Sequence, residues 1–328
     1  MSRLLGIVLL CSLAVRAGAC TIPVFRYALD RWQADSFQLI LPPDAVASTA
    51  DLLRPLRANG RANLDIRTAP TGSGLQHPVL CFPGSETAVW QGDLGPAALN
   101  QLLDSPARRD MVRRILAGDS VIWVVSGGDP AEAERIGQRL KFLEQVASLP
   151  IQDPNDPDSR LGPGPPLKLR FSLLRLEDAD PAEALLRRML AGPEREGDAP
   201  FAAAVFGRGR VLGSWSLAQL DDRAIEEACM FMVGRCSCRV KNENPGWDLL
   251  LDVDWDQALA QVGKATSDAP ASDVADPEPP AAPPTAPETV VTRAVDTVES
   301  GRANLWAAGA ALLLAIAAWR LLRRSSKD

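Results

Sequence analysis

Residues 120–148 read SVIWVVSGGDPAEAERIGQRLKFLEQVAS, and this stretch predicts a strand, a tight turn and a helix in direct succession. Residues 120–126 carry Val, Ile and Trp on both faces, which is typical of a strand buried inside a sheet. Gly127-Gly128-Asp129-Pro130 then opens a helix over residues 131–148, with Asp129 as the expected N-cap. Apolar side chains recur at helical spacing in this segment, at Ile136, Leu140, Leu143 and Val146. The stretch predicts an α/β fold around a buried strand.

The rest of the second half continues the alternation of strands and helices. The expected elements are a strand at 167–176, a helix at 181–191, a hairpin at 201–213 turning at Gly207-Arg208-Gly209-Arg210, and a helix at 222–233 that ends at Gly234. Six prolines between Pro150 and Pro166 indicate a long loop before the second strand. The order in this half is therefore β-α-β-α-β-β-α.

The first half has a similar order. Its expected elements are a helix or turn at 23–32, strands at 37–41 and 63–68 around a helix at 50–58, strands at 78–82 and 88–91, and a helix from Ala97 that restarts at Ser105-Pro106 and ends at Gly118.

This order resembles that of the thioredoxin-like superfamily. Asp198-Ala199-Pro200-Phe201 places a proline just before the hairpin, where that superfamily keeps a cis proline, and Gln76-His77-Pro78-Val79 does the same in the first half. The resemblance implies two tandem thioredoxin-like domains, at residues 20–118 and 119–264. The segments FRYAL at 25–29 and FGRGR at 206–210 are also similar to segments of uncharacterised bacterial envelope proteins, which implies no activity.

Both halves lack the dithiol of a thioredoxin enzyme. Such an enzyme needs Cys-x-x-Cys between its first strand and helix, because the helix N-terminus lowers the pKa of the attacking thiol. Gly127-Gly128-Asp129-Pro130 stands there in the second half, and Cys20-Thr21-Ile22-Pro23 in the first half has Pro23 in place of the second cysteine. We therefore expect degenerate domains without dithiol chemistry at these turns.

Cys236-Ser237-Cys238 is the remaining candidate for sulfur chemistry. Three interpretations stay open: a structural disulfide, locally or to Cys229 or Cys81; thiol–disulfide exchange helped by Cys20; or binding of a soft metal ion. If the chain is redox active, Cys236, Cys238 and Cys20 are its catalytic residues. No cofactor or resident metal is expected.

The chain begins with an expected signal peptide at residues 1–19. Arg3 precedes an apolar run at 4–15, and Ala17-Gly18-Ala19 matches the small residues before a signal-peptidase cut. Cys20 would then be the first mature residue, either as an acylated lipoprotein cysteine or as an ordinary thiol or disulfide partner. Acylation would also resolve the odd count of five mature cysteines.

The C-terminal part predicts a membrane anchor. Residues 265–302 are rich in Pro, Ala, Asp and Glu and predict a disordered stalk, because such a composition cannot bury enough apolar surface to fold. Residues 303–319 form an uncharged, mostly apolar run. With Arg320 snorkelling they predict one transmembrane helix at 303–322, and the basic tail at 323–328 is expected in the cytoplasm. This orientation places the bulk of the chain outside the inner (cytoplasmic) membrane.

A docking surface is the second candidate site. Arg208, Arg210, Trp215 and Trp247 combine the two residue types most frequent at interface anchors. The alternative is a hairpin turn with solvated arginines, followed by a belt that returns onto the second domain and buries Trp247 and Trp255. Asp252, Asp254 and Asp256 alternate as on a strand, which predicts an acidic edge or, less readily, a calcium site.

The composition excludes several functions. The single histidine, His77, excludes Ser-His-Asp triads and His-rich zinc sites within one chain. The formal net charge of −6 and the lack of a basic block before the C-terminal tail argue against a nucleic-acid partner. We expect a membrane-anchored, non-catalytic envelope protein that binds an unknown protein partner. The alternative is a thiol–disulfide oxidoreductase or metal-handling protein.

Overall fold

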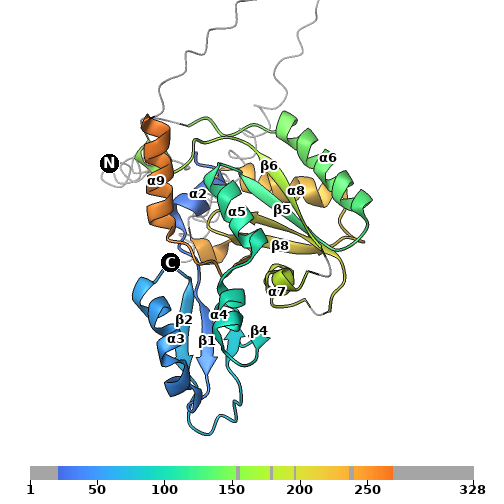
Figure 1. Ribbon diagram of the computed structural model, residues 1–328. Coiled ribbons are helices and arrows are strands. Elements are labelled where there is room, and N and C mark those ends of the chain that lie inside the picture. The colour runs from blue at the N-terminus through green and yellow to red at the C-terminus, as the bar shows by residue number, and fades with distance from the viewer. Residues whose placement is uncertain (1–20, 153–155, 178–179, 196, 236–239, 269–328) are drawn as a thin grey trace, which may run out of the picture. The chain divides into compact units, whose positions relative to one another are not determined.

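The chain folds as a mixed α/β protein with two sheets (Figure 1). The computed structural model describes residues 21–268 except 153–155, 178–179, 196 and 236–239. The first sheet has the order β2-β1-β3-β4 and the second β6-β5-β7-β8-β9. The strands are β1 (Phe37–Leu41), β2 (Leu64–Thr68), β3 (Val79–Cys81), β4 (Ala88–Gln91), β5 (Val121–Ser126), β6 (Phe171–Leu176), β7 (Phe201–Phe206), β8 (Arg210–Ser216) and β9 (Trp247–Asp248).

The two sheets share one pattern of strand pairing. In the first sheet, β1 is parallel to β2 and antiparallel to β3, and β3 is antiparallel to β4. In the second sheet, β5 is parallel to β6 and antiparallel to β7, and β7 is antiparallel to β8. The short strand β9 extends the second sheet beyond β8.

Two helices, α5 (Pro106–Leu116) and α6 (Pro130–Val146), begin where the sequence predicts a helix start. Asp129 Oδ1 accepts from Ala131 N at 2.9 Å, and Ser105 Oγ accepts from Arg108 N at 3.3 Å. These contacts confirm the expected starts of α6 and α5. The helices are α2 (Val24–Arg31), α3 (Ala45–Asn59), α4 (Pro96–Leu103), α5 (Pro106–Leu116), α6 (Pro130–Val146), α7 (Ala184–Ala191), α8 (Asp222–Val233) and α9 (Trp255–Asp268).

Strand β5 is buried on both faces, as its sequence predicts. Val121, Trp123 and Val125 belong to an apolar cluster with side chains of α6, α8 and α2. Ile122 and Val124 belong to another cluster, shared with the first sheet, α5 and α7. Two packed faces explain why β5 has no polar alternation.

Segments on both sides of the expected boundary at residues 118 and 119 are interleaved. Helix α2 packs against the second sheet, and Val24 N donates to Gly234 O at 3.0 Å. Conversely, a segment near the C-terminal end of the second half contacts the first half, because Asn63 Nδ2 donates to Leu249 O at 3.0 Å. The described residues accordingly belong to one compact unit.

Two expectations are wrong in detail. The resemblance to the thioredoxin-like superfamily implies cis peptide bonds before Pro78 and Pro200, but both bonds are trans. No cis peptide bond occurs among the described residues. Asp252, Asp254 and Asp256 do not share one strand face, because α9 begins at Trp255. Asp254 Oδ1 caps this helix by accepting from Gln257 N at 2.9 Å. Asp252 and Asp256 pair with different arginines, Arg61 and Arg208.

The predicted signal peptide, stalk, transmembrane helix and basic tail lie outside the described residues. Among the helices that are described, none is both long and apolar enough to cross a membrane.

Candidate functional site

The two arginines of the β7–β8 turn are buried, so the expectation that they are solvated is wrong. Arg208 Nε donates to Leu29 O at 2.8 Å, and its Nη2 donates to Asp256 Oδ1 at 2.8 Å. Arg208 therefore joins α2 to α9. The turn lies close to both segments, since a Cβ on Gly207 would lie 2.7 Å from Ala28 Cβ.

Arg210 belongs to a buried ionic cluster with Asp248 and Lys241. Its Nη2 donates to Asn244 O at 2.9 Å, and its Nη1 lies 3.4 Å from Asp248 Oδ1. The other carboxylate oxygen, Asp248 Oδ2, accepts from Lys241 Nζ and, at 2.6 Å, from Asp35 N. This cluster holds the segment around β9 against the second sheet.

The tryptophans of the expected docking surface also have structural contacts. The half-buried Trp215 ring lies 5.3 Å from the Trp123 ring between centroids. Trp247 Nε1 donates to Met189 O at 2.8 Å. Trp255 is buried and β9 pairs with β8, as the belt interpretation expects, but Trp247 is only half-buried. Arg208, Arg210, Trp215 and Trp247 are not gathered on one exposed surface.

The candidate redox cysteines Cys20, Cys236 and Cys238 lie outside the described residues. Cys81 and Cys229 are free and buried, so neither is a disulfide partner in this structure. Burial raises the pKa of the Cys229 thiol to about 12 and also raises the pKa of Cys81.

We expect Cys229 to resist alkylation in the folded protein. At about pH 8, a thiol with a pKa of about 12 is ionised in roughly one molecule in ten thousand. Iodoacetamide labelling followed by peptide mass mapping measures the alkylation rate of each cysteine. The rate at Cys229 should be lower, by a factor on the order of a thousand, than the rate at a cysteine introduced by Ser73→Cys in an exposed loop. Equal rates would contradict the burial of this thiol, and urea should abolish the difference.

The larger of the two main concavities among the described residues is not the best candidate site. Its volume is about 820 Å³, and it lies along α4, α5 and residues 251–253. Among its arginines, Arg109 pairs with Asp104 and Arg113 pairs with Asp110, and Arg108 is only 2% exposed. It offers little unpaired charge to a ligand.

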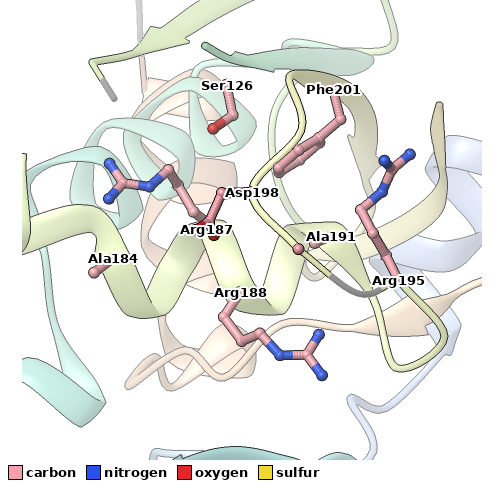
Figure 2. Close-up of a pocket in the computed structure, with 9 residues that line it drawn as sticks. Ser126, Ala184, Arg187, Arg188, Ala191, Arg195, Asp198 and Phe201 are labelled. Carbon is pink, nitrogen blue, oxygen red and sulfur yellow. The ribbon is translucent and has the colours of Figure 1, made fainter. Parts of the chain in front are cut away.

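A second concavity, of about 680 Å³, lies at the C-terminal end of β5. Ser126 is the last residue of β5, and it pairs with Phe201, the first residue of β7. We call this concavity the arginine pocket, because its charged lining residues are Arg187, Arg188, Arg195 and Asp198 (Figure 2). It adjoins the turn at residues 127–130, where the sequence lacks a dithiol.

The fold presents the arginines by burying the opposite side of α7. Leu186, Met189 and Leu190 are buried, so the intervening Arg187 and Arg188 face the pocket. Arg195 follows in the loop before β7 and lies over the Phe201 ring, 5.5 Å from its centroid.

Backbone carbonyls hold the three arginines without neutralising them. Arg187 Nη1 donates to Glu177 O at 2.7 Å, and Arg188 Nη1 donates to Gly192 O at 2.6 Å. Arg195 Nη2 lies 3.5 Å from Ser214 O. None of the three forms an ion pair with a carboxylate in the described part of the chain. Asp178 and Glu196 lie outside that part.

The charges in the arginine pocket favour anionic ligands. Among the described lining residues, three arginines and one aspartate give a formal surplus of two positive charges. Figure 2 shows the guanidinium groups of Arg187, Arg188 and Arg195 spread around the pocket and not converging on one point. The pocket can therefore hold several separated negative groups better than one compact anion.

The sequence contained part of this signal. An arginine pair on the polar side of a short amphipathic helix at 181–191 could have been singled out. Nothing local, however, indicates that Arg195 and Asp198 line the same concavity as Ser126, because the pairing of β5 with β7 brings them together. Comparison with known proteins supplies no further assignment, since no family model, curated protein or solved structure matches this sequence.

Proposed function

We propose that this chain is a membrane-anchored extracytoplasmic binding protein, and that its arginine pocket receives an acidic segment of a partner protein. The observation that carries the proposal is the set of three guanidinium groups, which line one concavity without a described carboxylate partner. Charge of one sign in a concave site attracts ligands of opposite charge and orients them.

The spread of the guanidinium groups favours an acidic segment over a single phosphate. Side chains on one face of an extended peptide are about 7 Å apart, which is twice the rise of one residue. Carboxylates at such spacing can reach separate arginines, whereas a single phosphate is too small to contact arginines on different sides of the pocket. Each guanidinium could then form a paired contact with one carboxylate.

A non-catalytic role fits the chemistry around the pocket. Ser126 is followed by Gly127-Gly128-Asp129-Pro130, so the turn has no sulfur, and no histidine lines the pocket.

The shared strand pairing of the two sheets supports the proposal that both are thioredoxin-like, although their prolines are trans. A thiol–disulfide or metal-handling role through Cys236 and Cys238 stays a prediction from the sequence.

The location rests on the sequence of the two ends. The expected signal peptide at 1–19 and the expected span at 303–322 both put the intervening residues outside the cytoplasm. The partner is then an envelope protein or an exported protein with an acidic segment.

Binding of a fluorescein-labelled octaglutamate peptide tests the pocket. The full chain in phosphatidylcholine nanodiscs should bind the peptide, as measured by fluorescence anisotropy, and binding should weaken with salt. The double variant Arg187→Gln, Arg195→Gln should lose at least about tenfold in affinity, because two of the three unpaired charges are gone.

The matched control removes two charges elsewhere. Arg54→Gln with Arg223→Gln changes the net charge equally, but these exposed arginines pair with Asp51 and Glu227. The control should bind like the native chain. An equal loss in both double variants would mean nonspecific attraction and would contradict the proposal, as would displacement of the peptide by inorganic phosphate at low concentration.

A further inference from the structure

Large apolar side chains are exposed at the C-terminal ends of α6 and α8. Phe142 and Val146 are 48% and 57% exposed on α6, and Ile151 just after it is 86% exposed. Met230 and Phe231 are exposed on the last turns of α8. We call these five residues the apolar end face. Such a concentration of exposed apolar side chains is typical of a contact surface.

The two helix ends lie at the same level because the helices run side by side in the same direction. Arg135 Nη1 pairs with Asp222 Oδ1 at 2.7 Å, and four residues further on Arg139 Nη2 pairs with Glu226 Oε2 at 2.6 Å. The next turn of each helix carries Phe142 and Met230.

The described chain begins beside this face. Gln152 Nε2 donates to Thr21 O at 2.9 Å, which places Thr21 next to Ile151. Pro23 forms a β-bridge with Arg235, which follows the end of α8. Residues 1–20 therefore join the described chain between the two sides of the apolar end face. They include Cys20, the candidate acylation site and, once the expected signal peptide is removed, the first mature residue.

Unpaired positive charge flanks the face. Lys141 and Arg235 are exposed, and neither forms an ion pair with any described carboxylate. The described acidic groups on the last turns of α6 and α8 are engaged: Glu226 pairs with Arg139, Glu227 pairs with Arg223, and Glu144 Oε2 accepts from Phe171 N at 2.8 Å. Apolar side chains flanked by basic ones are a usual combination on a surface that binds anionic lipid.

We infer that the apolar end face docks on the surface of a lipid bilayer containing anionic lipids. The inference does not depend on the arginine pocket, but the two sites are compatible. Phe171, which contacts the last turns of α6 through Glu144, pairs with Val121 at the start of β5. The arginine pocket lies at the other end of β5, beside Ser126. A chain docked by the apolar end face would keep the arginine pocket away from the membrane.

Photocrosslinking of the full chain tests this docking. p-Benzoylphenylalanine is introduced at Phe142, Ile151 or Met230, and each variant is reconstituted in vesicles of phosphatidylethanolamine and phosphatidylglycerol. Mass spectrometry after irradiation should find lipid adducts at all three positions. The same residue at the exposed Gln76, in a loop of the first sheet, is the control and should give none.

Other products would overturn the inference. Crosslinks to a second copy of the chain would identify a dimer interface instead of a lipid-binding surface. The absence of lipid adducts at the face, or equal adducts at Gln76, would also exclude specific docking. Because all three side chains are exposed, the substitutions should leave the fold intact, and circular dichroism of the same samples verifies this separately.

Discussion

Replacing Asp248 with Asn should lower the free energy of unfolding by about 3–5 kcal/mol. Asp248 is only 2% exposed, and its carboxylate contacts both Arg210 and Lys241. Asn has nearly the same size but no charge, so the substitution leaves the buried Arg210 without a carboxylate partner and leaves Lys241 with only the more exposed Asp35. Breaking a buried ionic cluster by removing one partner costs far more than removing an exposed pair.

Chemical denaturation followed by tryptophan fluorescence measures this loss. Asp51→Asn is the matched control, because Asp51 also pairs with an arginine but is exposed. The control should change the free energy of unfolding by less than about 0.5 kcal/mol. If Asp248→Asn costs no more than the control, water reaches the cluster, and the segment around β9 is not held by it.

The local parts of the fold could be predicted from sequence. The buried strand β5 and the start of α6 at Asp129 are confirmed, because both depend on signals within a dozen residues: a continuous apolar run, paired glycines and a cap. The mixed α/β class follows from these elements and is confirmed by the two sheets.

Features that depend on distant segments were predicted less well. Gly207-Arg208-Gly209-Arg210 is a hairpin turn, and turns are usually solvated. Arg208 is buried because Leu29 and Asp256 contact it, although both are far from it in the sequence. The alternating Asp252, Asp254 and Asp256 suggested a strand, since a short polar-apolar alternation does not reveal that Asp254 caps a helix.

The dependence on distant segments also explains why the sequence singled out the wrong residues as a candidate site. Arg208 and Arg210 were singled out for their residue type and nearby tryptophans, but burial gives them a structural role. The residues of the arginine pocket come from α7, the loop before β7 and the end of β5, so their convergence depends on strand pairing. Composition and motif spacing carry no information about such a convergence.

Replacing Gly246 with Ala should destabilise the fold as much as Asp248→Asn does. We expect a loss of about 4 kcal/mol in the free energy of unfolding. Gly246 has a φ of +106°, which L-residues rarely adopt, and a Cβ there would lie 2.0 Å from Val211 O. Because Val211 pairs with Trp247, relief of this collision requires β9 to move away from β8. That movement would also separate Asp248 from Arg210.

A second glycine separates the two causes of this loss of stability, which are the unfavourable φ and the collision of the added Cβ with Val211 O. Gly74 also has a positive φ, +72°, but a Cβ there would have no atom within 4 Å. Gly74→Ala should cost only about 1 kcal/mol, the conformational part alone. If both alanine variants lose the same free energy in denaturation, close contact between β9 and β8 contributes nothing, and the belt is attached only through its side chains. A much larger loss at Gly246 would instead locate part of the chain's stability in the close backbone approach between these two strands.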